Sequence, residues 1–114
     1  MMIEEERWIT ALKALGDRSR LRLIRTLLDK AMTVNDLSER LGISQYNVSK
    51  HLRILREAGL VEATKMANRR EYAIPEQYKG QKPGYSVLDL GNLIFRFEDA
   101  PPPGEEMPAE PVAV

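Results

Sequence analysis

The middle of the chain contains the pattern that most restricts its fold. Two amphipathic segments, 33–41 and 44–58, are separated only by Gly42 and Ile43, and two strand-like segments follow them directly. After Gly59 the apolar residues change from the three-to-four spacing of a helix to the alternation of a strand. This order predicts two helices joined by a tight turn and followed by a β-hairpin.

The second of these segments has clear limits and two different sides. Ser44 is a favourable N-cap, and Gly59 stands where a left-handed residue commonly ends a helix. Val48, Leu52 and Leu55 are spaced at i, i+4 and i+7, so this side is predicted to face the core. The opposite side is polar, as is required of a helix that enters the DNA major groove, where the base edges can be distinguished.

We therefore expect a winged helix-turn-helix that contacts double-stranded DNA through this helix and the hairpin tip. Gln and Asn can pair with adenine edges, Tyr can touch a thymine methyl or a phosphate, and a helix N-terminus suits a phosphate. Basic side chains at the hairpin tip can reach a neighbouring minor groove or the backbone. The predicted DNA-binding residues are Ser44, Gln45, Tyr46, Asn47, Ser49, Lys50, Arg53, Lys65, Arg69 and Arg70.

The flanking segments complete a mainly helical fold. Residues 3–15 are predicted to form an amphipathic helix, and Asp17 is a good N-cap for the helix that follows. The hairpin is predicted from strands 60–66 and 70–74, with Asn68 at the tolerant position of a turn over residues 67–69. The predicted fold class is α+β, mainly α with a small β-hairpin wing.

The C-terminal third gives weaker signals. Residues 75–86 are rich in Pro and Gly and are predicted to be a loop. Residues 86–97 are apolar with an interruption at Gly91-Asn92, which predicts a second hairpin or, alternatively, an interrupted helix. We expect a winged helix-turn-helix domain at 1–75, an extension at 76–99 that packs on this domain or on a dimer partner, and a disordered tail at 100–114.

The distribution of charge favours nucleic acid although the net charge is zero. Residues 17–74 carry twelve Lys and Arg against seven Asp and Glu, an excess of five. Acidic residues near both ends supply the compensating charge. The middle of the chain is thus the part suited to approach phosphates, although a solvated surface without a ligand gives the same pattern.

The composition excludes several classes of site. The chain has no Cys, so it forms neither disulfides nor thiolate metal sites. No apolar run approaches the ~18 residues of a membrane span, and the acidic start is unlike a secretory signal, so we expect a cytoplasmic protein without membrane contact. We find no catalytic set and expect neither an enzyme nor a cofactor. The single His51 is expected to pack or to contact a phosphate, because structural zinc needs four ligands.

Two motifs of the chain are similar to those of a known family. They are LKALGDRSRLRLI at residues 12–24 and ISQYNVSKHLRILREAGLV at residues 43–61. The first resembles the opening signature of the ArsR/SmtB family of winged helix-turn-helix repressors, and the second resembles the recognition helix of that family and its exit into the wing. The likeness covers roughly residues 8–75 and implies a homodimer that sits on a palindromic operator and blocks transcription until a signal releases it.

Two departures limit what this resemblance implies. Arg18-Ser19 stand where the family often has Pro-Thr after the Asp. The usual cysteine pair would lie near residues 33–37, which here are Thr, Val, Asn, Asp and Leu, and no His is present for a C-terminal metal site. Metal sensing is therefore not implied, and the sequence does not reveal an inducer.

Trp8, Ile9 and Leu12 on the first predicted helix have two interpretations. They are either part of the core of one chain or an interface between two chains, because this helix carries more apolar surface than one small domain needs to cover. We expect a homodimer, to which residues 88–97 can contribute in the same way. The alternative function is a protein-interaction module that keeps the winged fold without specific DNA binding, and a salt-titrated gel shift separates the two.

Overall fold

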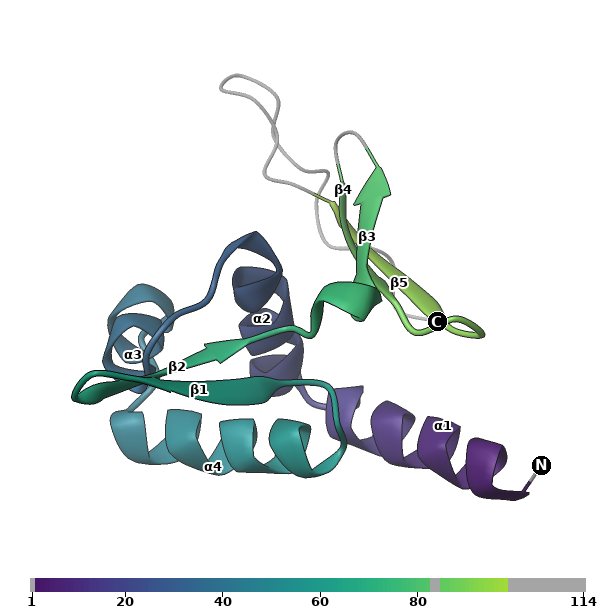
Figure 1. Ribbon diagram of the computed structural model, residues 1–114, viewed down its shortest axis with the longest axis horizontal. Coiled ribbons are helices and arrows are strands. Elements are labelled where there is room, and N and C mark those ends of the chain that lie inside the picture. The colour runs from purple at the N-terminus through teal and green to yellow at the C-terminus, as the bar shows by residue number, and fades with distance from the viewer. Residues whose placement is uncertain (1, 83–84, 99–114) are drawn as a thin grey trace, which may run out of the picture.

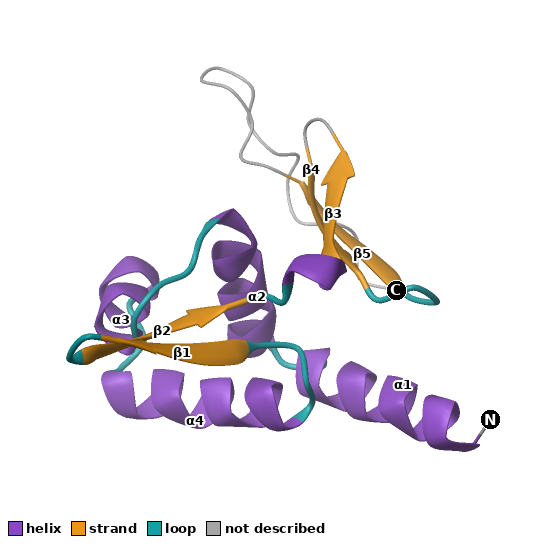
Figure 2. Ribbon diagram, in the orientation of Figure 1, coloured by secondary structure: helices purple, strands orange, loops and turns teal. Residues whose placement is uncertain are grey.

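The computed structural model describes residues 2–82 and 85–98, which form four α-helices, one 3-10 helix and two antiparallel sheets (Figures 1 and 2). The predicted tail at 100–114 lies outside the described residues. The α+β class is as predicted, with a wing after the fourth helix and additional strands at the C-terminal end. The elements are α1 (Met2–Leu15), α2 (Arg18–Asp29), α3 (Val34–Leu41), α4 (Gln45–Glu57), β1 (Glu62–Met66), β2 (Arg69–Ala73), η1 (Glu76–Tyr78), β3 (Lys79–Lys82), β4 (Tyr85–Asp89) and β5 (Ile94–Glu98).

Side-chain caps explain where α2, α3 and α4 begin. Asp17 and Ser44 each accept the backbone N–H three residues ahead, at 3.1 and 3.2 Å. Thr33 forms a capping box with Asp36, in which each side chain bonds the backbone N–H of the other residue. Each cap satisfies an amide that the helix leaves without a partner and stabilises the helix by about 1 kcal/mol. The three helix starts are therefore local properties of the sequence.

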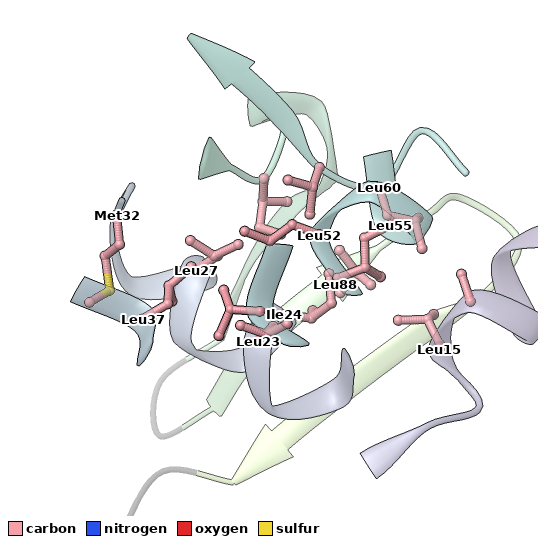
Figure 3. Packing of buried hydrophobic residues seen from close by; sticks show 14 of the residues in the cluster. Leu15, Leu23, Ile24, Leu27, Met32, Leu37, Leu52, Leu55, Leu60 and Leu88 are labelled. Carbon is pink, nitrogen blue, oxygen red and sulfur yellow. The ribbon is translucent and has the colours of Figure 1, made fainter. Parts of the chain in front are cut away.

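A single core lies between α2, α3 and α4 (Figure 3). Val48, Leu52 and Leu55 of α4 are completely buried, as their spacing predicts. Figure 3 shows Leu88 of β4 among the buried side chains of the helices, and its side chain is also completely buried. The second sheet therefore packs against α2 and shares the core of the helices. The other completely buried large residues are Leu23, Ile24, Leu27, Leu37 and, at 2% exposure, Ile74.

The turn of the wing differs from the prediction. Met66 pairs with Arg69, so the turn contains only Ala67 and Asn68, and Arg69 belongs to β2. The positive backbone φ is that of Ala67, at 54°, and not that of Asn68. A two-residue hairpin favours a positive φ at its first central residue because that conformation matches the twist of the strands. The geometry of the turn thus overrides the preference of Asn for this conformation.

The predicted loop at 75–86 is wrong, because η1, β3 and the start of β4 lie within it. The strands are ordered β3-β4-β5. β4 and β5 form the predicted second hairpin, and the alternative prediction of an interrupted helix is wrong. Gly80 pairs with Val87, and a Cβ placed on Gly80 would lie 2.5 Å from a methyl carbon of that valine. Glycine here permits close packing inside a strand and does not mark a loop.

Helix α1 buries one side and exposes its largest apolar residues. It extends away from the other helices in Figure 1. Ala11, Ala14 and Leu15 face the core. The interpretation of the other apolar residues as core of the same chain is therefore wrong, and the dimer interpretation stays a prediction. The exposed fractions are 38% for Trp8, 50% for Ile9 and 47% for Leu12.

Arg20 joins the end of α1 to α4. Its Nε donates to the carbonyl of Ala14 at 2.5 Å, and another guanidinium nitrogen donates to the carbonyl of Lys13 at 3.5 Å. These carbonyls belong to the last turn of α1, which has no intrahelical donors for them. A third nitrogen, Nη1, lies 3.1 Å from Nδ1 of His51, which accepts the bond because Arg has only donors. One side chain thus holds three helices together.

The Asp17 cap predicts how stability depends on pH. The backbone N–H of Arg20 lowers the pKa of Asp17, and the positive charge of the same residue adds to this effect. A carboxyl with a lowered pKa stabilises the fold above its unfolded pKa of about 3.9, and this contribution is lost as the pH falls through the folded value. We expect the free energy of unfolding to drop more steeply below about pH 4 in the natural protein than in Asp17→Asn, because Asn caps a helix without titrating. Urea denaturation over this pH range measures both slopes, and equal slopes would contradict the assignment.

Candidate nucleic-acid interface

The polar side of α4 is open to solvent. In Figure 1, α4 lies along one border of the molecule beside β1 and β2, and the sheet of β3, β4 and β5 lies at the opposite border. The sheet of β3, β4 and β5 therefore does not cover this side of the helix. Tyr46 is the most exposed of the large hydrophobic residues described, at 79%. The other exposed residues of this surface are Ser44, Gln45, Asn47, Ser49, Lys50 and Arg53, which are the residues that the sequence predicts.

The N-terminus of α4 combines a positive helix end with an oriented amide. Ser44 uses its hydroxyl oxygen to cap the helix, and the remaining amides of the first turn carry the positive end of the helix dipole. Gln45 donates from Nε2 to Oδ1 of Asn35, which lies in the first turn of α3, at 2.9 Å. An amide already held in place loses less conformational entropy when it binds a partner. The sequence prediction missed Asn35, because the bond joins two helices and no local pattern indicates it.

Arg53 can leave its intrahelical partner at little cost. Its Nε lies 3.5 Å from Oε2 of Glu57, and both side chains are more than half exposed. Exposed pairs of this i, i+4 type contribute about 0.3–0.5 kcal/mol. The contact of Arg53 with a phosphate would easily replace this interaction, since hydrogen bonds between charged groups are stronger in a desolvated interface.

The wing places like charges opposite each other. Lys65 of β1 pairs directly with Arg70 of β2, and both side chains are exposed. Like charges at directly opposed positions destabilise a hairpin. Arg69 is partly neutralised by Glu71, whose carboxylate oxygen lies 2.7 Å from its guanidinium. The pair of Lys65 and Arg70 therefore offers two positive charges that an anionic partner would stabilise.

His51 lies on a different side of α4. Its side chain is 16% exposed, and Nδ1 is directed to Arg20 and, at 4.0 Å, to a carboxylate oxygen of Asp17. Of the two roles expected for His51, the structure agrees with packing and not with phosphate contact.

The described part of the chain contains neither a candidate metal cluster nor a candidate membrane span. Among residues 2–82 and 85–98, no three His, Asp or Glu side chains are grouped so that they could hold a metal ion. None of the helices in the described ranges is long and apolar enough to cross a membrane.

Comparison with known proteins identifies the family. Residues 17–63 match the model of the bacterial regulatory proteins of the arsR family. The HTH-type transcriptional regulator NmtR of Mycobacterium tuberculosis is 33% identical over 93 residues, which cover 82% of this chain and 78% of NmtR. The chain belongs to the ArsR family. The resemblance found in the sequence motifs is thereby confirmed.

Solved structures of similar transcriptional regulators share the fold. The transcriptional activator HlyU of Vibrio cholerae is 42% identical over 59 residues, and the chain spans only about half of its length, 55%. A solved structure of this HlyU aligns with a TM-score of 0.61 at 36% identity, over 65% of this chain and 80% of HlyU. The homodimeric winged helix-turn-helix domain of Mb0332 from Mycobacterium bovis aligns with a TM-score of 0.64 at 26% identity, over 67% of this chain and 71% of that domain.

Proposed function

We propose that this ArsR-family chain is a sequence-specific regulator that binds double-stranded DNA and acts in the cytoplasm as a homodimeric repressor on a palindromic operator. The observation that carries the proposal is the division of α4 into two sides. One side is completely buried through Val48, Leu52 and Leu55, and the other is exposed and polar beside a basic hairpin. A recognition helix needs both sides, because it must be held rigidly while it presents hydrogen-bonding groups to the major groove.

The residues of the interface divide into two roles. Gln45 and Asn47 carry amides that can make paired hydrogen bonds to adenine, so we assign base recognition to them. Lys50, Arg53 and the wing residues carry positive charges, and we assign them to the phosphates, which position the protein without reading sequence. This division explains how a chain with zero net charge can bind DNA, because its positive charges are gathered at one surface.

A second copy of the chain is the partner that the exposed side of α1 fits. Trp8, Ile9 and Leu12 form an apolar strip on α1 that the described part of one chain leaves 38–50% exposed. A symmetric dimer through this strip would present two copies of α4 to successive major grooves about 34–36 Å apart, as a palindromic operator requires. The homodimeric state of the Mb0332 domain supports this arrangement.

Repression is the mode of regulation that needs the fewest further contacts. A bound dimer blocks polymerase simply by occupying promoter DNA, whereas activation requires an additional surface for a partner. HlyU bears the name of an activator, so a reporter assay is part of the test. Deleting the gene that encodes this protein should raise expression of a reporter whose promoter contains the selected operator. A fall in reporter expression would contradict repression.

Selection from random duplexes, followed by salt-dependent binding of two variants, tests DNA recognition. Gln45→Ala should lose about 1–3 kcal/mol of discrimination at one base position of each half-site. Arg70→Gln should weaken binding to all sequences by similar amounts and reduce the salt dependence by about one phosphate contact per protomer. Failure to enrich any sequence at low salt would instead favour the protein-interaction module. Unchanged sequence preference in Gln45→Ala would show that Gln45 does not read a base.

A further inference from the structure

A hollow lined by three arginines lies between α2, the end of α3 and β4. Its volume is about 330 Å³, and Arg22 and Arg25 of α2 line it together with Arg40 of α3. Ser86 contributes the side formed by β4. The C-terminal sheet is therefore a wall of this site, and α2 and α3 alone would leave it open.

The hollow has an excess of positive charge. Asp29 is the one carboxylate that lines it, against three guanidinium groups. Among the described residues, no carboxylate lies within 4.0 Å of the guanidinium nitrogens of Arg22, Arg25 or Arg40, although other arginines of the chain form such ion pairs. Three arginines that face one concave space without a neutralising partner favour an anionic ligand.

Two of the three guanidinium groups are held in place by backbone carbonyls. Arg22 donates to the carbonyl of Leu41 at 2.9 Å, and Arg25 donates to the carbonyl of Glu98 at the end of β5. Each guanidinium carries five N–H donors, so these single bonds leave several donors for a ligand. A donor that is already oriented costs less entropy on binding, and the planar arginine fork matches the oxygens of a phosphate.

None of the residues that line the hollow belongs to α4 or to the wing, although Arg40 also lines a neighbouring hollow with Arg69 and Glu71 of β2. Asn35, which contacts Gln45, and Arg40 are five residues apart on α3, a rotation of about 140° around the helix axis. Arg40 thus lies between the hollow and Arg69 of the wing, whereas Arg22 and Arg25 line only the hollow of α2, α3 and β4. The proposed contacts of α4 and the wing with DNA do not account for Arg22 and Arg25.

We propose that this hollow binds a small ligand that carries one or two phosphate groups. The volume lies at the lower end of the range for small-molecule sites, which fits a compact anion. Arg40 supplies the donors from α3, and Arg22 and Arg25 supply the donors from α2. None of its lining residues belongs to α4 or to the wing, so the proposal does not rest on the proposed DNA binding.

Titration with inorganic pyrophosphate, followed by NMR of the arginine Nε–H groups, tests the proposal. We expect saturable chemical-shift changes at Arg22, Arg25 and Arg40. Pyrophosphate should bind about tenfold more weakly to Arg40→Gln, because this variant loses one charge-assisted hydrogen bond. The side chain of Arg40 makes no hydrogen bond or ion pair with any described residue, so this variant should fold normally. Arg18→Gln is the matched control, because it removes the same charge from α2 outside the hollow.

Three results would overturn the proposal. The first is that pyrophosphate shifts no arginine signal. The second is that Arg18→Gln and Arg40→Gln weaken pyrophosphate binding equally, as expected for unspecific screening. The third is a loss of affinity for the selected DNA duplex in Arg40→Gln, without pyrophosphate, as large as that in Arg70→Gln. That loss would show that the arginines of the hollow bind the phosphates of DNA and not those of a free ligand.

Discussion

Leu88→Ala is expected to lower the free energy of unfolding by about 2–5 kcal/mol, the cost of an unfilled cavity in a packed core. Leu88 is completely buried although it belongs to the C-terminal sheet, and it packs in the same cluster as Leu23 and Ile24 of α2. Such a loss is a large fraction of the stability of a small domain. The result would show that the helices and this sheet fold as one cooperative unit.

Urea denaturation followed by circular dichroism measures this effect, and Ile94→Ala in the same hairpin is the control. Ile94 is 56% exposed, so its truncation should cost much less than that of Leu88. Equal small losses for both variants would mean that the sheet is an appendage that contributes little to the core. The predicted division at residues 75 and 76 would then describe two independent units.

Placing a charge on the apolar strip of α1 is expected to abolish dimers and to weaken operator binding by about 10²- to 10⁴-fold. Ile9→Asp and Leu12→Asp each put a carboxylate where the proposed partner chain has to bury apolar surface. A dimer binds two half-sites at the cost of one association, and a monomer loses this gain in effective concentration. Sedimentation gives the oligomeric state, and titration of the selected duplex gives the affinity.

Thr10→Asp is the matched control for these variants. Thr10 is exposed on α1, and it lies about 100° around the helix from Ile9 and about 160° from Leu12. The control should remain a dimer and bind DNA as the natural protein does. A natural protein that is monomeric at micromolar concentration would contradict the dimer directly, as would strip variants that keep full affinity for the palindrome.

Much of the fold could be predicted because its signals are local. Asp17 and Ser44 cap the helices that the sequence assigns to them, and the spacing of Val48, Leu52 and Leu55 in α4 indicates its buried side. The exposure of the predicted DNA-binding residues of α4 follows from the same spacing, because the sides of a helix are related by a fixed rotation.

The remaining features depend on contacts between distant segments. Gly80 looks like a loop residue until its pairing with Val87 shows why a side chain is excluded there. The bond between Gln45 and Asn35 and the contact of Arg20 with His51 each join different helices. No periodicity or propensity reports such pairs, because they arise only after the helices have packed.

The central claim is that the exposed side of α4 and the wing form the surface that binds DNA. The direct measurement is a titration of ¹⁵N-labelled protein with a duplex obtained by selection, in which the shift of each backbone amide is followed. The account predicts that the largest shifts fall in residues 44–53 and 65–70, with small shifts in β3, β4 and β5. Shifts concentrated in the C-terminal sheet, with the amides of α4 unchanged, would contradict it.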